Sequence, residues 1–84
     1  MNLRVLYFAQ LKESAGIPYE ELETTAATPS AVYEELANRH GFQLAAHNLR
    51  AAVNNEFVPM DHPLHTGDEL AFIPPVSGGF SLGL

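Results

Sequence analysis

Hydrophobic and polar residues alternate along the first part of the chain as they do in a β-strand. From Leu3 to Leu11 one set of alternate side chains is apolar, and the opposite set also contains Leu6 and Phe8. A strand with apolar residues on both faces is typical of a central position, or of a sheet with one face reserved for a partner. We therefore predict a first strand over Leu3–Leu11, followed by a polar turn over Lys12–Pro18.

Apolar spacing changes to a helical period after residue 28. Thr28 is suited to the N-cap, Pro29 to the first helical position, and Gly41 to a left-handed C-cap. Val32 and Leu36 then lie on one apolar stripe. These signals predict one helix between Thr28 and Gly41.

Short strands between turn signals complete the pattern. Asn54-Asn55 tolerates positive φ and is typical of a tight hairpin, and Pro74-Pro75 ends the last strand because proline cannot donate to a sheet ladder. The strands that we predict after the first one are Tyr19–Glu23, antiparallel to it, and Ala51–Val53, Glu56–Val58 and Glu69–Ile73.

This order of elements predicts an α+β fold in which one main helix packs across a small mixed sheet. A β-grasp, or ubiquitin-like, fold fits this order, whereas a ferredoxin-like sandwich needs a second helix. With 84 residues the chain has room for one domain. We predict a β-grasp domain over residues 1–75 and a flexible tail over residues 76–84.

Composition narrows the possible functions. The chain has no cysteine, which excludes disulfides, thiolate metal sites and a cysteine nucleophile, and fits a cytoplasmic location. Four Lys and Arg residues against ten Asp and Glu residues give a net charge of −6, so nucleic acid and anionic membrane surfaces are poor partners. No apolar run has the roughly 20 residues that span a bilayer. A basic patch on a protein partner suits this charge better.

Side chains that carry chemistry elsewhere lack the right context here. His62 and His65 flank Pro63 without an obvious third ligand, so we predict turn histidines and no metal site. No serine has the surroundings of a catalytic nucleophile. The sequence therefore predicts no enzyme site in this chain alone.

The tail has a composition of its own. Pro74 and Pro75 favour an extended backbone, Val76 and Ser77 continue it, and Gly78-Gly79 carries no side chains. Six extended residues reach roughly 20 Å from the domain, which suits entry into a narrow channel of another protein. The alternative is a frayed terminus, since chain ends and glycine pairs are often disordered.

Several motifs together resemble the small subunits of molybdopterin synthase. The resemblance covers nearly the whole chain through Gly79 and rests on VLYFAQLKE at positions 5–13, AAVNN at 51–55, DHPL at 61–64, GDE at 67–69 and FIPPVSGG at 72–79. It implies a β-grasp fold and a sulfur carrier in molybdenum cofactor biosynthesis, which is not an enzyme on its own.

The resemblance also implies a reaction sequence. An adenylating, E1-like enzyme uses ATP to activate the carboxylate of Gly79, which is then converted to a thiocarboxylate. The tail, with Gly78 as its slender approach, enters the large catalytic subunit and gives its sulfur to cyclic pyranopterin monophosphate. The complex is a heterotetramer, and the carrier itself binds no cofactor.

The resemblance also implies a docking surface for the large subunit beside the tail. We predict that it consists of Phe8, Ile73, Pro74, Pro75, Val76 and Ser77. For Phe8 the alternative is ordinary core packing, since large aromatic residues are common in any core.

One feature departs from this family. Its glycine pair normally ends the chain, but here residues 80–84 follow Gly79, which therefore has no free carboxylate. Either a processing protease removes residues 80–84, which we favour, or the chain is inactive in sulfur transfer, or the extra residues make a separate contact. Two other functions stay open: a binding or regulatory module of the synthase, and a carrier for another pathway such as thiamine synthesis or protein conjugation.

Overall fold

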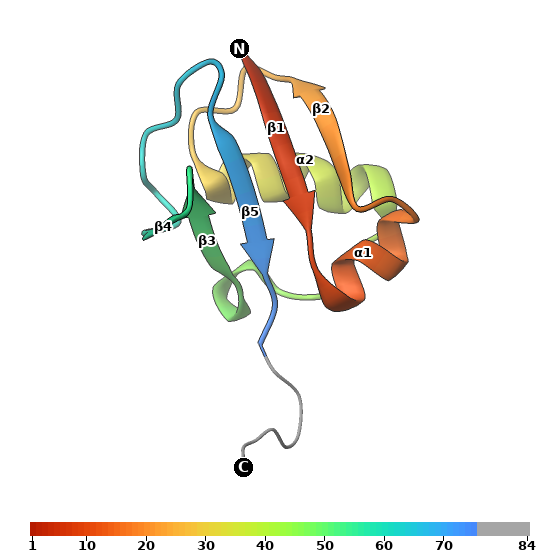
Figure 1. Ribbon diagram of the computed structural model, residues 1–84. Helices are drawn as coiled ribbons and strands as arrows, with labels where there is room; N and C mark the ends of the chain where they lie inside the picture. The colour runs from red at the N-terminus through yellow and green to blue at the C-terminus, as the bar shows by residue number, and fades with distance from the viewer. Residues whose placement is uncertain (76–84) are drawn as a thin grey trace.

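The computed structural model describes residues 1–75 of the chain. Five strands, two α-helices and a 3-10 helix form this part (Figure 1). In chain order they are β1 (Asn2–Tyr7), α1 (Ala9–Ala15), β2 (Tyr19–Glu23), α2 (Pro29–His40), η1 (Ala46–Asn48), β3 (Arg50–Val53), β4 (Glu56–Val58) and β5 (Glu69–Ile73).

The strands form one mixed sheet in the order β2-β1-β5-β3-β4. β1 and β5, which come from opposite ends of the domain, pair in parallel, and the other neighbours are antiparallel. Figure 1 shows α2 lying across one face of this sheet. The mixed sheet with one main helix agrees with the predicted α+β layout.

α2 begins and ends where the sequence predicts. The Thr28 hydroxyl accepts a hydrogen bond of 3.2 Å from the Ala31 N–H, and Gly41 adopts a left-handed φ of 75°. Val32 and Leu36 are fully buried against the sheet, together with Tyr33. The predicted hairpin is also confirmed, with Asn54 and Asn55 both at positive φ.

The prediction of one strand over Leu3–Leu11 is wrong in its second half. β1 ends at Tyr7, and Ala9–Ala15 forms the helix α1, so most of the predicted polar turn is helical. In the sequence Leu11 continues the alternating pattern of the strand, but in the structure it is a buried residue of α1. α1 then ends at Gly16, whose φ of 78° and N–H bond to the Lys12 carbonyl close the turn.

A single apolar core fills the space between the sheet and α2. β1 contributes alternate residues, β5 contributes Leu70 and Phe72, and the loops add Phe42 and Leu64. The complete set of buried residues in this core is Leu3, Val5, Tyr7, Leu11, Leu22, Val32, Tyr33, Leu36, Phe42, Leu49, Ala51, Val53, Leu64, Leu70 and Phe72. Figure 1 shows no helix of residues 1–75 lying across the opposite face of the sheet.

Candidate functional site: the tail root and the open face of the sheet

The tail starts from the centre of the sheet. β5 lies between β1 and β3, and its last residues lead directly into Pro74 and Pro75. Pro74 is buried and Pro75 is exposed. We call Ile73–Pro75 the tail root. Because β5 is paired on both sides, the tail root continues from a strand that the sheet holds firmly. The predicted site residues Val76, Ser77, Gly78 and Gly79 lie outside the described residues.

Parallel pairing brings Phe8 to the tail root. Tyr7 lies opposite Phe72 in the β1–β5 register, so the residues that follow them, Phe8 and Ile73, leave the same end of the sheet. Phe8 is 44% exposed and Ile73 is partly buried. Core packing is therefore not the role of Phe8, and its docking role stays a prediction. Pro74 offers less surface to a partner than its neighbours do because it is buried.

An apolar row crosses the open face next to the tail root. The register places Leu6 opposite Tyr19 and Ala71, and places Ala52 opposite Ala71 and Phe57. These five residues belong to five different strands and share the face that α2 does not cover. Tyr19 and Phe57, at the two edges, are 49% and 64% exposed. We call the row Tyr19, Leu6, Ala71, Ala52 and Phe57 the open-face row.

Sequence reasoning missed the two aromatic ends of this row. Phe57 lies in a three-residue strand, where period-two alternation is too short to assign a face, and Tyr19 was assigned only to a strand. The signal that identifies them is the strand pairing, which is a long-range property. Large exposed aromatic residues that share one face are typical of a protein-binding surface.

Arginines lie over both aromatic ends. The Arg4 guanidinium is 5.1 Å from the centre of the Tyr19 ring, and that of Arg50 is 4.7 Å from the Phe57 ring. Arg4 is also paired with Glu21 at 2.8 Å. Arg50 lies opposite Ile73 in the β3–β5 register, beside the tail root. Cations over aromatic faces stabilise these exposed rings. At the Tyr19 end the charge of Arg4 is offset by its ion pair with Glu21.

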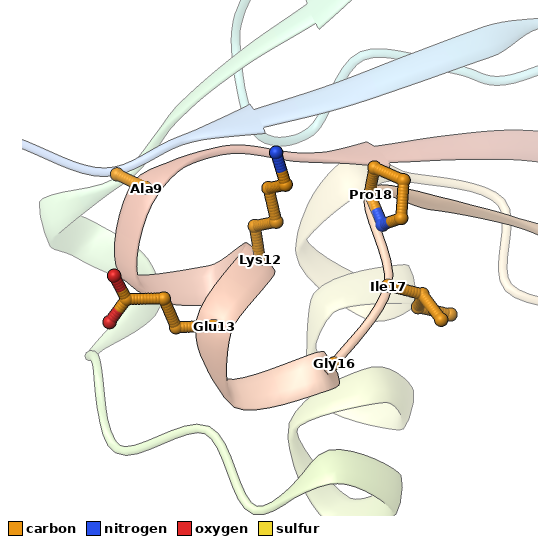
Figure 2. Close-up of a pocket in the computed structure, with 6 residues that line it drawn as sticks. All are labelled: Ala9, Lys12, Glu13, Gly16, Ile17 and Pro18. Carbon is orange, nitrogen blue, oxygen red and sulfur yellow. The ribbon is translucent and has the colours of Figure 1, made fainter.

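A recess open to solvent lies beside α1. It is lined by Ala9, Lys12, Glu13, Gly16, Ile17 and Pro18, which Figure 2 shows as sticks. The Lys12 and Glu13 side chains leave α1 in different directions, and no ion pair joins them. The recess has no cluster of convergent polar groups, so it lacks the features of a small-molecule site. It instead extends the surface beside Phe8.

A polar cluster lies at the other side of β1, on the face that α2 covers. Glu20 receives hydrogen bonds from the Tyr7 hydroxyl and, at 2.7 Å, from His40, and it pairs with Arg39 at 3.2 Å. Burial acts to raise the pKa of Glu20, but the bonds from Tyr7 and His40 and the charge of Arg39 lower it below its usual value. Burial and the bond to Glu20 raise the pKa of the Tyr7 hydroxyl. The cluster joins β1, β2 and α2.

Within residues 1–75 no group of three or more His, Asp and Glu side chains is placed to hold a metal ion, and no helix is long and apolar enough to cross a membrane. The surface formed by Phe8, the tail root and the open-face row combines exposed aromatic side chains with arginines that lie over two of them. That surface is suited to another protein.

Known proteins agree with this architecture. The ThiS family model matches residues 5–79, so the match ends at Gly79. The molybdopterin synthase sulfur carrier subunit of Escherichia coli is 41% identical over 80 residues, covering 92% of this chain and 99% of the relative. Among solved structures, SAMP1 of Haloferax volcanii is similar with a TM-score of 0.75 and 27% identity, covering 94% of this chain and all of that one.

A second solved structure extends the likeness in fold. The complex of subunits 1 and 2 of the molybdopterin-converting factor from Helicobacter pylori contains a chain that is similar with a TM-score of 0.65 and 21% identity. It covers 94% of this chain and 100% of that one. These neighbours confirm the predicted β-grasp fold.

Proposed function

This chain belongs to the ThiS family, and we propose that it carries sulfur for molybdenum cofactor biosynthesis as the non-catalytic small subunit of molybdopterin synthase. The observation that carries the proposal is the 41% identity to the E. coli sulfur carrier subunit over nearly the whole of both chains. The motif FIPPVSGG at positions 72–79 and a family match that ends at Gly79 support it. A cytoplasmic location follows from this function as part of the proposal.

Gly79 is the residue that we propose to carry the sulfur. An adenylating enzyme joins the Gly79 carboxylate to the adenylyl group of ATP with release of pyrophosphate, which supplies a good leaving group. A sulfur nucleophile then displaces AMP and leaves a thiocarboxylate. Transfer of that sulfur to cyclic pyranopterin monophosphate inside the large subunit keeps the reactive thioacid away from bulk water.

The proposed docking surface on the large subunit consists of Phe8, the tail root and the open-face row. Its apolar area and its position at the start of the tail support this assignment. A firmly paired β5 lets the docked domain fix where the tail begins, so that a tail of fixed length reaches a defined point. We propose that the adenylating enzyme also binds this chain, and that two carriers bind a dimer of large subunits.

Sulfur loading requires a free carboxylate on Gly79. Residues 80–84 occupy that carboxylate in a peptide bond, so we propose that a protease cleaves after Gly79 before adenylation. The bulky Phe80 next to the glycine pair distinguishes the precursor from the processed chain, because a channel shaped for glycine excludes it.

The experiment that tests this function compares the full chain with a chain that ends at Gly79. Each is incubated with the adenylating enzyme, ATP and a sulfur source, and its intact mass is measured. We expect the chain ending at Gly79 to exchange one oxygen for sulfur and the full chain to keep its mass. The loaded protein is then added to the large subunit with cyclic pyranopterin monophosphate, and molybdopterin is measured.

A chain that ends at Gly78 is the matched control, because it keeps the domain and docking surface but is one residue short. We expect it to bind the large subunit and to produce little molybdopterin. If the chain ending at Gly79 acquires sulfur but supports no synthesis with an active large subunit, the assignment to this pathway is wrong. If it acquires no sulfur, the carrier role is wrong as well, and a regulatory module is favoured.

A second candidate function is attachment to other proteins. The likeness in fold and sequence to SAMP1 of H. volcanii, a small archaeal modifier protein, favours it. An adenylated Gly79 that reacts with a lysine amine instead of sulfur gives an isopeptide bond and releases AMP. Mass spectrometry of lysine peptides that carry the residues of the tail distinguishes this outcome from sulfur transfer.

A further inference from the structure

The backbone of Ala9 is an outlier at the edge of the proposed docking surface. Its φ is +51°, in the left-handed region that alanine disfavours because of its Cβ atom. The other non-glycine residues at positive φ within residues 1–75 are Asn54 and Asn55, in a hairpin turn where asparagine is well suited. Ala9 has no such turn chemistry, so its conformation needs another explanation.

Local sequence does not stabilise the junction between β1 and α1. Phe8 is the N-cap residue and makes no side-chain capping bond, and the first turn of α1 has no acidic residue. In α2, by contrast, Thr28 caps the helix through its hydroxyl. A glycine at position 9 would adopt the same φ more easily. The sequence therefore keeps an unfavourable residue at an uncapped junction.

Tertiary contacts hold the junction in place. The Tyr7 N–H donates to the Pro18 carbonyl at 2.9 Å, which joins two separate segments, and a local turn bond of 3.1 Å runs from the Leu11 N–H to the Phe8 carbonyl. The Leu11 side chain is buried in the core and anchors α1. Backbone strain that is maintained by surrounding structure is concentrated at functional sites.

The turn at Ala9 determines how Phe8 is presented. Phe8 keeps the extended backbone of β1, with φ −128° and ψ 150°, and the chain turns away immediately after it. Its ring stays exposed at the end of the sheet that carries Ile73. Ala9 itself lines the recess beside α1 (Figure 2). Within the left-handed region that the surrounding contacts impose, the methyl group of Ala9 allows a narrower range of backbone angles than a glycine would.

We propose that Ala9 is a positioning residue for docking: its left-handed backbone, imposed by the surrounding contacts and narrowed in range by the methyl group, fixes the exposed Phe8 ring beside the tail root before the partner binds. The proposal rests on the proposed function, because it assumes that Phe8 contacts the large subunit. Preorganisation of this kind raises affinity by reducing the side-chain ordering that binding requires. The strain at Ala9 lowers the stability of the free domain.

The test replaces Ala9 with glycine in a chain ending at Gly79. We expect the midpoint of urea unfolding to stay the same or rise. Glycine relieves the strain in the folded state, which raises stability, and this gain offsets the loss caused by the larger entropy of the unfolded chain. We expect binding to the large subunit, measured by calorimetry, to weaken about two- to tenfold, the cost of ordering one mobile side chain. If Ala9 had only a structural role, its substitution would not weaken binding while stability stays the same or rises.

Three further chains make the result specific. In a Phe8→Ala background, Ala9→Gly is expected to have no additional effect on affinity. A chain made by chemical synthesis with D-alanine at position 9 is expected to bind as tightly as the parent, because D-alanine favours positive φ and keeps the methyl group. Ser14→Gly loosens α1 without changing position 9, so it is expected to lower stability and leave affinity unchanged.

Different failures point to different proposals. If Phe8→Ala weakens binding but Ala9→Gly does not, Ala9 has no positioning role, while the proposed function stands. If Ala9→Gly weakens binding equally with and without Phe8, the effect does not pass through Phe8 and the inference is wrong. If the parent chain does not bind the large subunit at all, the docking proposal and this inference are both contradicted.

Discussion

The two faces of β1 have nearly the same apolar character in sequence but different surroundings in the structure. Val5 and Tyr7 on one face are buried beneath α2, whereas Leu6 and Phe8 on the other face lie on the open side of the sheet. Apolar residues on the covered face stabilise the domain by leaving water on folding. On the open face Leu6 is partly buried and Phe8 stays exposed, so a partner that covers this face would remove further apolar surface from water. One face of the strand therefore stabilises the domain, and the other belongs to the docking surface that we propose.

Phenylalanines at one end of the sheet give the strongest test of this comparison. Phe72 is fully buried and Phe8, on the next strand, is exposed. We expect Phe72→Ala to lower the free energy of unfolding by about 3–5 kcal/mol, a large part of the stability of a small domain. Phe8→Ala is expected to lower it by less than about 1 kcal/mol. Urea denaturation followed by circular dichroism measures both, and equal losses would contradict the assignment of the two faces.

We expect the affinity for the large subunit to depend more on the exposed aromatic residues than on the buried ones. Phe57→Ala removes the most exposed aromatic side chain of the open-face row and is expected to weaken binding to the large subunit about tenfold or more. The unfolding midpoint should change little. Glu56→Ala, one residue away in β4, is the matched control because Glu56 pairs with Val53 and does not belong to the row. Unchanged affinity for Phe57→Ala would exclude the edge of the open face from the interface.

The covered face also contains the polar cluster around Glu20, whose side chain is 14% exposed. Glu20→Gln is expected to destabilise the domain by about 1–3 kcal/mol at neutral pH, because it removes a charged acceptor shared by Tyr7, His40 and Arg39. Binding to the large subunit should be unaffected. A change in affinity without a loss of stability would place the cluster in the interface instead.

The pH dependence of that loss follows from the lowered pKa of Glu20. A carboxyl group whose pKa is lower in the folded state contributes stability above its unfolded pKa, and that contribution is lost as pH falls through the folded pKa. We therefore expect the difference in unfolding free energy between parent and Glu20→Gln to shrink as pH falls below about 4. A difference that grows on acidification would contradict the sign of this shift.

The smallest expected effect is at the rim of the open face. Arg50→Gln removes the cation over Phe57 and is expected to cost about 0.5 kcal/mol of stability, as for exposed cation–aromatic pairs. In a double-mutant cycle with Phe57→Ala the two effects should be non-additive. Additive effects would mean that the guanidinium and the ring do not interact in solution.

Local chemistry made much of the fold predictable. The position of α2 followed from Thr28, Pro29 and Gly41, and the hairpin followed from Asn54-Asn55, because caps and turns depend on residues close in sequence. The end of β1 was not predictable in the same way. Leu11 fits a strand by alternation, and only its burial against the core decides that it belongs to a helix.

The candidate site also has one part that the sequence predicts and another that only the tertiary structure decides. The sequence by itself predicted Phe8, Ile73 and the glycine pair as site residues, since they belong to motifs that resemble a known family. It also predicted the chemistry of the tail, because that prediction depends only on residues that follow one another in the chain. Tertiary structure alone decided that Phe8 is exposed, that Tyr19 and Phe57 share its face, and that Ala9 is strained. The physical reason is that faces and registers depend on strand pairing between residues far apart in the chain.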